Sequence, residues 1–257
     1  MIEHDYPILE YDDARRAIIE PVDHLAPLEA MPARVVICFF REVIDAACIG
    51  KADVVTHLGS EMGRHAVYAL PLEDGRRVGV FHPGVGAPLA GGFLDELIAI
   101  GGRKFIACGS AGVLASEIAV GHLIVPESAV RDEGTSYHYL PPAREVAADL
   151  QAVAAIKRTL EAHGIPYRTG KTWTTDGIYR ETPGKVARRK AEGCLTVEME
   201  AAAFFAVAQF RGVPFGQILY GGDDVSGAAW DPRDYVRRGA STREKLFWLA
   251  VEAVLSL

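Results

Sequence analysis

The stretch RVVICFF, Arg34–Phe40, is apolar after its arginine and rich in β-branched and aromatic residues. A continuous apolar run of this length predicts a strand that is buried on both faces of a sheet. Outward from it, similar short runs alternate with segments of helical spacing. Strands are expected at Asp53–Leu58, His65–Leu70, Arg76–His82, Lys104–Cys108, His122–Pro126, Tyr167–Thr174 and Val213–Leu219, and helices at Pro88–Gly101, Arg144–His163, Ala201–Phe210 and Ser241–Leu257. This alternation predicts an α/β fold, a single domain with three layers, α/β/α, around a central mixed sheet.

The chain before the first strand has a different composition. Residues 1–32 are polar and interrupted by four prolines. We expect them to form an N-terminal lead-in segment, and residues 33–257 to form the folded domain.

Composition excludes several classes of partner. The 257 residues carry a formal net charge of −7, so the basic excess typical of nucleic-acid binding is missing. No apolar stretch is long enough for a membrane span. The four cysteines form no Cys-x-x-Cys pair, so no metal site is expected. The acidic N-terminus lacks the pattern of a signal peptide, and together with the scattered cysteines it indicates a cytoplasmic protein.

Two glycine-rich loops are expected after strands, where α/β folds bind their ligands. They are GVGAP, Gly84–Pro88, and CGSAG, Cys108–Gly112. Successive backbone N–H groups in such loops can bind an anion, and the Ser110 hydroxyl adds a donor. A plain tight turn explains each loop equally well.

A third segment, TVEMEAAAFFAVA, Thr196–Ala208, joins an apolar strand end to an alanine-rich helix. In an extended backbone, Glu198 and Glu200 would share one face and Met199 would point to the other. Both carboxylates are therefore candidates for binding substrate. The alternative is that they are acids that stabilise the start of the helix.

These segments resemble the nucleoside phosphorylase family, in its uridine and purine branches. VEMEAA is the most specific match, and GVGAP, CGSAG, TTDGIY (Thr174–Tyr179) and the aspartate pair of YGGDDVSG accompany it in the right order. The similarity runs from about His24 to the C-terminus. It implies the fold predicted above, with residues 33–257 as the catalytic domain, and cleavage of the bond between a base and its ribose.

The resemblance also implies roles for residues around the sugar and the base. Glu200 would bind the ribose 2′- and 3′-hydroxyls, since a carboxylate suits a vicinal diol, and Met199 would pack on the sugar. Asp223 would help to protonate the departing base, although it could instead be a surface loop acid. The remaining substrate contacts implied are Ile178, Tyr179 and His24, with His24 reaching the ribose across a dimer interface. Ile178 and Tyr179 could equally belong to the core, and His24 could be an ordinary surface histidine.

Phosphate binding is implied for Arg41, Arg64, Ser110 and Gly109, because the planar guanidinium of arginine suits phosphate. Arg64 corresponds to an arginine that reaches into a neighbouring subunit, so a homo-oligomer, dimer or hexamer, is implied. Either arginine could instead be a solvated surface charge. The implied reaction uses inorganic phosphate as co-substrate and needs no metal or organic cofactor.

Three departures from the family pattern bear on the reaction. The family's glycine-aspartate-proline before Arg41 is absent, and Ala107 stands where phosphorylases carry another phosphate-binding arginine. One phosphate ligand is thus missing or supplied from elsewhere, which favours a nucleoside hydrolase as the alternative. The uracil-reading residues of the uridine enzymes are not evident in YRETPGK, which favours a purine. Uridine phosphorolysis and a non-catalytic nucleoside-binding protein are the further alternatives.

Overall fold

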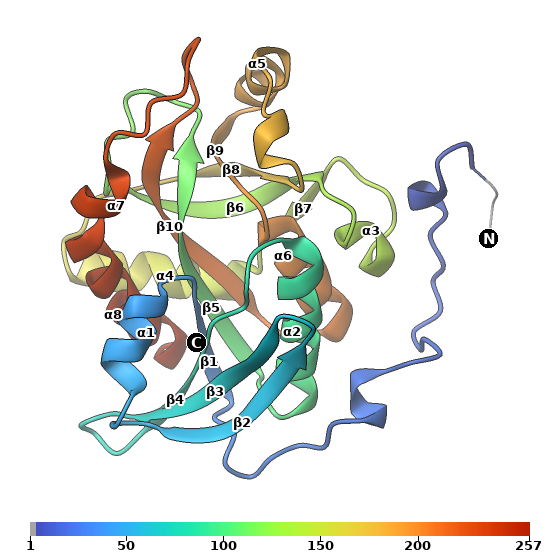
Figure 1. Ribbon diagram of the computed structural model, residues 1–257, viewed down its shortest axis with the longest axis vertical. Coiled ribbons are helices and arrows are strands. Elements are labelled where there is room, and N and C mark those ends of the chain that lie inside the picture. The colour runs from blue at the N-terminus through green and yellow to red at the C-terminus, as the bar shows by residue number, and fades with distance from the viewer. Residues whose placement is uncertain (1–3) are drawn as a thin grey trace.

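The computed structural model describes residues 4–257, and its central element is a ten-stranded mixed sheet (Figure 1). The strands are β1 (Arg34–Cys38), β2 (Asp53–Ser60), β3 (Gly63–Pro71), β4 (Arg77–Phe81), β5 (Lys104–Val113), β6 (Leu123–Asp132), β7 (Glu145–Ala147), β8 (Tyr167–Thr175), β9 (Cys194–Glu198) and β10 (Phe215–Asp224). The helices are α1 (Arg41–Cys48), α2 (Ala87–Ala99), α3 (Ser136–Tyr139), α4 (Leu150–Ala162), α5 (Pro183–Ala191), α6 (Ala201–Arg211), α7 (Tyr235–Arg238) and α8 (Ala240–Leu255).

The sheet closes on itself in one part. Its strands follow the order β10-β6-β8-β9-β5-β1-β4-β3-β2, and β10 also pairs with β5. Strands β5, β9, β8, β6 and β10 therefore form a closed circuit, from which β1, β4, β3 and β2 extend as an open wing. Each of the five strands in the circuit consequently has neighbours on both edges.

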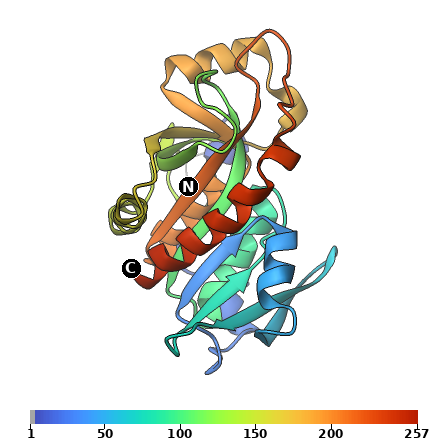
Figure 2. The same cartoon turned by 90° about the vertical axis from the view of Figure 1, so that its left-hand side faces the viewer.

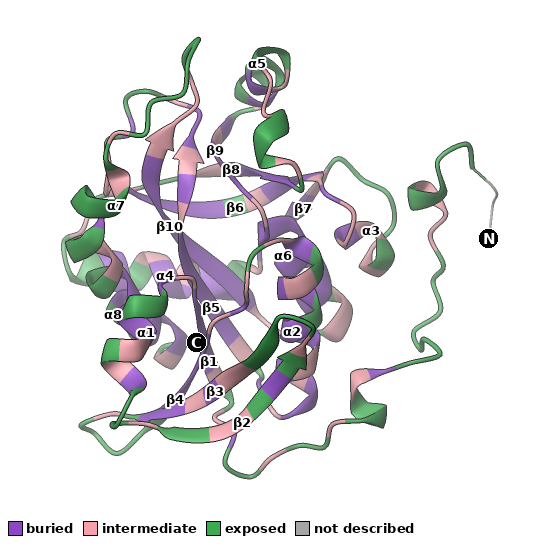
Figure 3. Cartoon of the chain, in the orientation of Figure 1, coloured by how far each residue is buried: buried purple, intermediate pink, exposed green. Residues whose placement is uncertain are grey.

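Helices cover both faces of the sheet, and neighbouring residues of β10 show the alternation. Phe215 stacks on Phe204 of α6 with ring centroids 4.8 Å apart. The next residue, Gly216, faces Ile156 and Ala152 of α4 so closely that an added Cβ would lie 2.9 Å from Ile156. One layer thus holds α2 and α6, and the other holds α4 and α8. Figure 2 shows α8 lying across the sheet, and Figure 3 shows that the strands between the layers are buried.

The predicted α/β fold with a central mixed sheet is confirmed. Residues 4–33 have no strand and only the short 3-10 helices Pro7–Leu9 and Pro21–Asp23, and Figure 3 shows this segment largely exposed. Arg211 fixes the segment to the body through ion pairs with Glu20 (2.9 Å) and Asp95 of α2 (2.6 Å). No helix in residues 4–257 has the length and hydropathy needed to cross a membrane.

Three local predictions are corrected. The helix predicted over Arg144–His163 begins only at Leu150, because Asp149 caps it by accepting the Ala152 N–H (2.9 Å); Glu145–Ala147 instead pairs with β6. The predicted CGSAG loop is part of strand β5, held by β10. The first strand ends at Cys38 instead of Phe40, since Arg41 begins a helix.

Candidate active site

A gap along one edge of β5 positions the site. Strand β10 pairs with β5 from Phe105 to Val113 and so occupies one whole edge. On the other edge, β1 pairs only as far as Cys108, and β9 begins to pair at Gly112. In the described part of the chain, residues 109–111 therefore have no partner strand on that edge. Such a point, where neighbouring strands diverge, is where α/β sheets bind ligands.

A cavity of about 330 Å³ lies at this gap. It collects residues from seven separate parts of the chain. Its lining is Phe39, Val85, Gly109, Ser110, Ala111, Gly112, Ile178, Glu181, Val197, Glu198, Met199, Glu200, Gln217, Asp223 and Tyr235.

Glu198 lines the cavity, but both of its carboxylate oxygens already accept hydrogen bonds from the protein itself. Its Oε1 accepts the Thr174 hydroxyl (2.6 Å), and its Oε2 accepts the backbone N–H groups of Glu200 (2.7 Å) and Ala201 (2.6 Å). These N–H groups lie at the N-terminal end of α6, where the helix has no partner for them. Glu198 therefore holds the start of α6.

Glu200 is the residue immediately before α6, and its carboxylate reaches across to the GVGAP loop. Oε1 accepts the Gly86 N–H at 2.6 Å. Gly84 and Gly86 both have positive φ, 75° and 94°, a backbone that glycine adopts without strain. The loop thus presents a backbone N–H to a carboxylate of the same chain. The backbone is not extended from Glu198 to Glu200, because β9 ends at Glu198 and the chain turns, so the alternation of a strand does not apply there. Glu198, Met199 and Glu200 all line the cavity.

The two buried carboxylates are costly to ionise together. Burial raises the pKa of Glu198 to about 6, against the opposing effect of its hydrogen bonds. Burial, together with the charge of Glu198, raises the pKa of Glu200 to about 8. A ligand that donates hydrogen bonds to Glu200 would favour its charged form.

Asp223 and Asp224 face different surroundings. Asp223 lines the cavity, and its Oδ2 accepts the indole N–H of Trp230 at 2.7 Å. Asp224 accepts the Ser226 N–H (2.7 Å) and lies 3.9 Å from the Arg233 guanidinium, so it fixes the turn after β10.

The sequence interpretation missed Glu181, a half-buried carboxyl in the cavity wall. Burial and the neighbouring charge of Asp223 raise its pKa to about 7. Neither a hydrogen bond nor an ion pair to this side chain is present within residues 4–257. No motif points to Glu181, because it follows TTDGIY in a charged stretch without a strong pattern.

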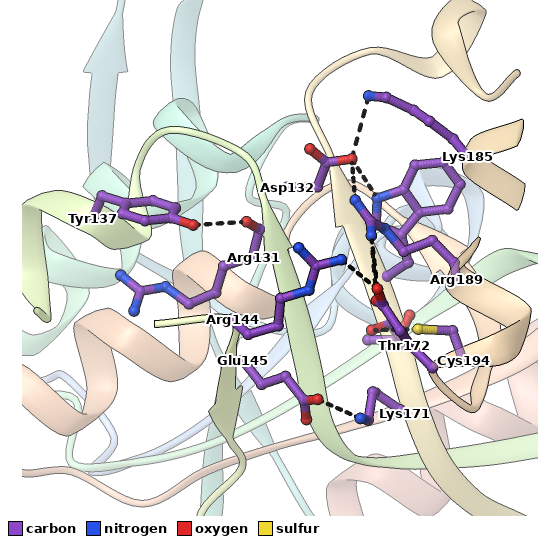
Figure 4. Close-up of polar contacts among 12 residues, drawn as sticks. Arg131, Asp132, Tyr137, Arg144, Glu145, Lys171, Thr172, Lys185, Arg189 and Cys194 are labelled. Atoms are coloured by element: carbon purple, nitrogen blue, oxygen red, sulfur yellow. Dashed lines mark hydrogen bonds and ion pairs between the residues drawn. The ribbon is translucent and has the colours of Figure 1, made fainter. Parts of the chain in front are cut away.

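A polar cluster anchors the segment that carries Ile178 and Glu181. Asp132 of β6 accepts hydrogen bonds from the Trp173 indole (3.0 Å) and from Lys185 (3.3 Å) and Arg189 (3.0 Å) of α5 (Figure 4). The Arg189 guanidinium also lies 5.3 Å from the Trp173 ring. Helix α5, which directly follows Glu181, is thereby fixed to the sheet.

Arg41 and Arg64 come together, but in a second cavity of about 230 Å³ that also contains His65 and His82. Phe39 and His82 stand between the two cavities, with ring centroids 6.3 Å apart. Arg41 keeps 75% of its side chain exposed and pairs only with Asp45 in the described chain. Neither arginine lines the cavity that contains Ser110 and Gly109.

Of the remaining predicted site residues, some line the cavity and others lie outside it. Met199 and Ile178 line the cavity, whereas Tyr179 is 93% exposed and lies outside its wall. His24 is exposed at the end of the 3-10 helix Pro21–Asp23 and is also outside the wall. Within residues 4–257, no group of three or more histidine, cysteine, aspartate or glutamate side chains is arranged to hold a metal ion.

The fold and the cavity define a class, the α/β proteins with a nucleoside phosphorylase fold. The uridine phosphorylase structure from Vibrio fischeri ES114 superposes with a TM-score of 0.74 at 24% identity, covering 90% of this chain and 94% of that one. The AMP nucleosidase structure from Bacteroides thetaiotaomicron gives 0.71 at 21% identity and 88% of both chains. At these identities the likeness shows the fold.

The chain belongs to the phosphorylase superfamily, whose sequence model matches residues 34–253. A guanosine phosphorylase from Halorubrum lacusprofundi is 30% identical over 145 residues, 56% of this chain and 60% of that protein. A uridine phosphorylase from Thermococcus kodakarensis is 33% identical over 154 residues, 55% of this chain and 56% of that protein. The chain thus matches about three fifths or less of the length of these curated relatives. The predicted resemblance to nucleoside phosphorylases is confirmed.

Proposed function

We propose that this protein cleaves the N-glycosidic bond of a purine nucleoside with inorganic phosphate, giving the free base and ribose 1-phosphate. The observation that carries the proposal is the gathering of Glu200, Asp223 and Ser110 around one cavity. They come from the start of α6, the end of β10 and the middle of β5. The three groups have the chemistry needed at the sugar, the base and the nucleophile.

Glu200 binds the ribose hydroxyls in this proposal. It is fixed by the Gly86 N–H at 2.6 Å, so its orientation is set before the substrate arrives. Its charged form stabilises the positive charge that develops on the ribose as the glycosidic bond breaks. Met199 packs against the sugar from the same turn.

Asp223 stabilises the departing base. A purine leaves most readily when N7 carries a proton, and a carboxyl beside that atom supplies or shares it. The Trp230 N–H donates to Oδ2 of Asp223, and Asp223 is part of the cavity lining. This role, together with the missing uracil-reading residues, supports a purine; named relatives include both guanosine and uridine phosphorylases.

Phosphate is placed by Ser110 and Gly109 at the unpaired edge of β5. Arg41 and Arg64 lie in the neighbouring cavity, which supports a homo-oligomer, dimer or hexamer, in which one chain's arginine completes the site of another. His24 would act across the same interface. The proposed steps use side chains and phosphate alone, so we propose no metal or organic cofactor. Four buried free thiols support a reducing compartment, the cytoplasm.

A panel of nucleosides, assayed with and without phosphate and followed by chromatography, tests the proposal. Guanosine, inosine or adenosine should be cleaved only with phosphate and give ribose 1-phosphate. Faster cleavage of uridine would move the protein to the uridine branch.

Hydrolysis is the second candidate, and one observation favours it. The described lining of the cavity contains no arginine or lysine, and Ala107 stands where phosphorylases carry an arginine. Cleavage at an unchanged rate without phosphate, with free ribose as product, would establish hydrolysis.

A further inference from the structure

Gln217 of β10 is a buried amide whose oxygen has no hydrogen-bond partner among the described residues. Its side chain is 1% exposed, and its Oε1 accepts no hydrogen bond from residues 4–257. Buried polar atoms are almost always paired, because an unpaired one has lost its water without compensation. Gln217 is also part of the cavity lining. A ligand in the cavity would supply the partner that the chain does not.

The strand register gives the direction of this amide. Gln217 pairs with Ala107 of β5, and Phe215, two residues earlier, lies on the same face of the sheet. Phe215 stacks on Phe204, one turn into the helix that begins after Glu200. The Gln217 side chain therefore points to the side on which Glu200 lies. Asp223 follows six residues later on the same strand, about 20 Å away at the Cα atoms.

Gln217 lies beside Ala107, the position at which this chain lacks the family's phosphate-binding arginine. The family's arginine would extend from residue 107 on the same face of the sheet, beside the strand neighbour at position 217. In this chain the large side chain is on β10 and the small one on β5. The amide thus occupies space next to the site of the missing guanidinium, on the face of β5 that carries Gly109 and far from Asp223.

The chemistry of an amide differs from that of an arginine in one respect. A guanidinium only donates hydrogen bonds, whereas an amide has two donor hydrogens and an acceptor oxygen. Hydrogenphosphate carries acceptor oxygens and a P–OH group that donates, so it satisfies both halves of the amide. Sulfate at neutral pH has no proton to donate and would leave Oε1 unpaired.

We propose that Gln217 binds inorganic hydrogenphosphate in the cavity, in place of the missing arginine, and makes the site select phosphate over sulfate. This inference rests on the proposed function, since it concerns the nucleophile of the same reaction. Gln217 thereby becomes a phosphate-binding and specificity-determining residue.

Calorimetric titration of the whole protein with phosphate and with sulfate tests the inference without turnover. The wild-type protein should bind phosphate at least about tenfold more tightly than sulfate. Gln217→Met, similar in volume but unable to form these bonds, should lose that preference. In steady-state assays it should raise KM for phosphate about tenfold or more and leave KM for the nucleoside unchanged.

A purely structural role for Gln217 predicts a different pattern. Removing an unpaired buried amide should raise the melting temperature of Gln217→Met, whatever the amide does in the cavity. If that rise comes with unchanged phosphate KM and unchanged anion preference, the inference is overturned. Gln209→Met is the matched control, because Gln209 is exposed on α6 and bonds to the Ala147 carbonyl (2.7 Å); it should alter neither KM.

The outcomes separate this inference from the proposed function. If the wild-type protein carries out phosphorolysis and Gln217→Met has a normal KM for phosphate, the proposed function is supported and the inference about Gln217 is overturned. Phosphate binding that depends on Gln217 supports the inference even if no nucleoside in the panel is cleaved. A protein that hydrolyses nucleosides and binds no phosphate contradicts both.

Discussion

Glu198 accepts the backbone N–H of Glu200 at 2.7 Å, so one acid of the VEMEAA segment positions the other. The same carboxylate accepts the Ala201 N–H and the Thr174 hydroxyl. The two glutamates, similar in sequence, therefore have different tasks. Glu198 is bound to the protein, and Glu200 presents its carboxylate to the cavity.

Exchanging each glutamate for glutamine should separate these tasks. We expect Glu200→Gln to lower kcat/KM by about tenfold or more, because it removes a charge facing a developing cation. Glu198→Gln should chiefly lower the free energy of unfolding, by about 1–2 kcal/mol, as a lost helix cap does. Denaturant unfolding beside steady-state kinetics checks both, and the opposite pattern would reverse the assignment.

The same pair predicts a pH-dependent stability. Glu198 and Glu200 have folded-state pKa values of about 6 and about 8, above the ordinary 4.5. The folded protein therefore holds these protons more tightly than the unfolded chain does. This contribution to stability is complete below pH 4.5 and is lost as the pH rises through about 6 and then about 8.

Glu200→Gln has no proton to lose at that position. Its free energy of unfolding relative to wild type should increase between pH 5.5 and pH 8.5, measured by denaturant titration at both values. An unchanged difference between the two proteins would show that Glu200 ionises normally. Bound nucleoside should diminish the effect by stabilising the charged form.

The neighbouring aspartates should not be equivalent. Asp223→Ala should lower kcat for a purine nucleoside by about a hundredfold, the scale of a lost proton donor. Asp224→Ala should keep most of this activity and lower stability by about 1 kcal/mol, since it loses the Ser226 N–H bond. Near-normal purine turnover by Asp223→Ala would remove Asp223 from the mechanism.

The ionisation of Glu181 should affect the pH dependence of kcat/KM. Its pKa of about 7 means that it becomes charged as the pH rises through neutrality, beside Asp223. A negative charge there favours the protonated, cationic purine, so kcat/KM should rise through about pH 7. Glu181→Gln should lack that rise, whereas Glu192→Gln, a change at the C-terminal end of α5, should retain it.

Patterns with a strong period or a strong motif were predictable from the sequence. The apolar run at Arg34 predicted a buried strand, and VEMEAA predicted the junction of β9 and α6, because local residue preference and tertiary packing agree there. The Arg144–Ala148 region has helical spacing, yet it pairs with β6 as a strand. Its partner lies outside any local window, so tertiary contacts override the local preference.

Candidate site residues could be predicted from the sequence only where they lie within a recognisable motif. Gln217 and Glu181 follow no motif, and both line the cavity. Within residues 4–257 the Gln217 oxygen accepts no hydrogen bond, and the Glu181 carboxyl has its pKa raised by burial and by Asp223. Arg41 and Arg64 carry the right chemistry, but the rings of Phe39 and His82 separate them from Ser110. Such separation depends on side-chain packing, which a single sequence does not display.

The closed circuit of β5, β9, β8, β6 and β10 also bears on how the molecule folds. Phe105 pairs with Phe215, more than a hundred residues along the chain, and this pairing joins the two ends of the circuit. Contacts of such long sequence separation require large loops to close and form slowly. The cavity borrows Asp223 and Gln217 from β10, so it is incomplete until that strand is in place. Ligand binding therefore requires the fully assembled chain. Nucleoside or phosphate added during refolding should bind only after β10 has paired with β5, and should leave the rates of the earlier folding steps unchanged.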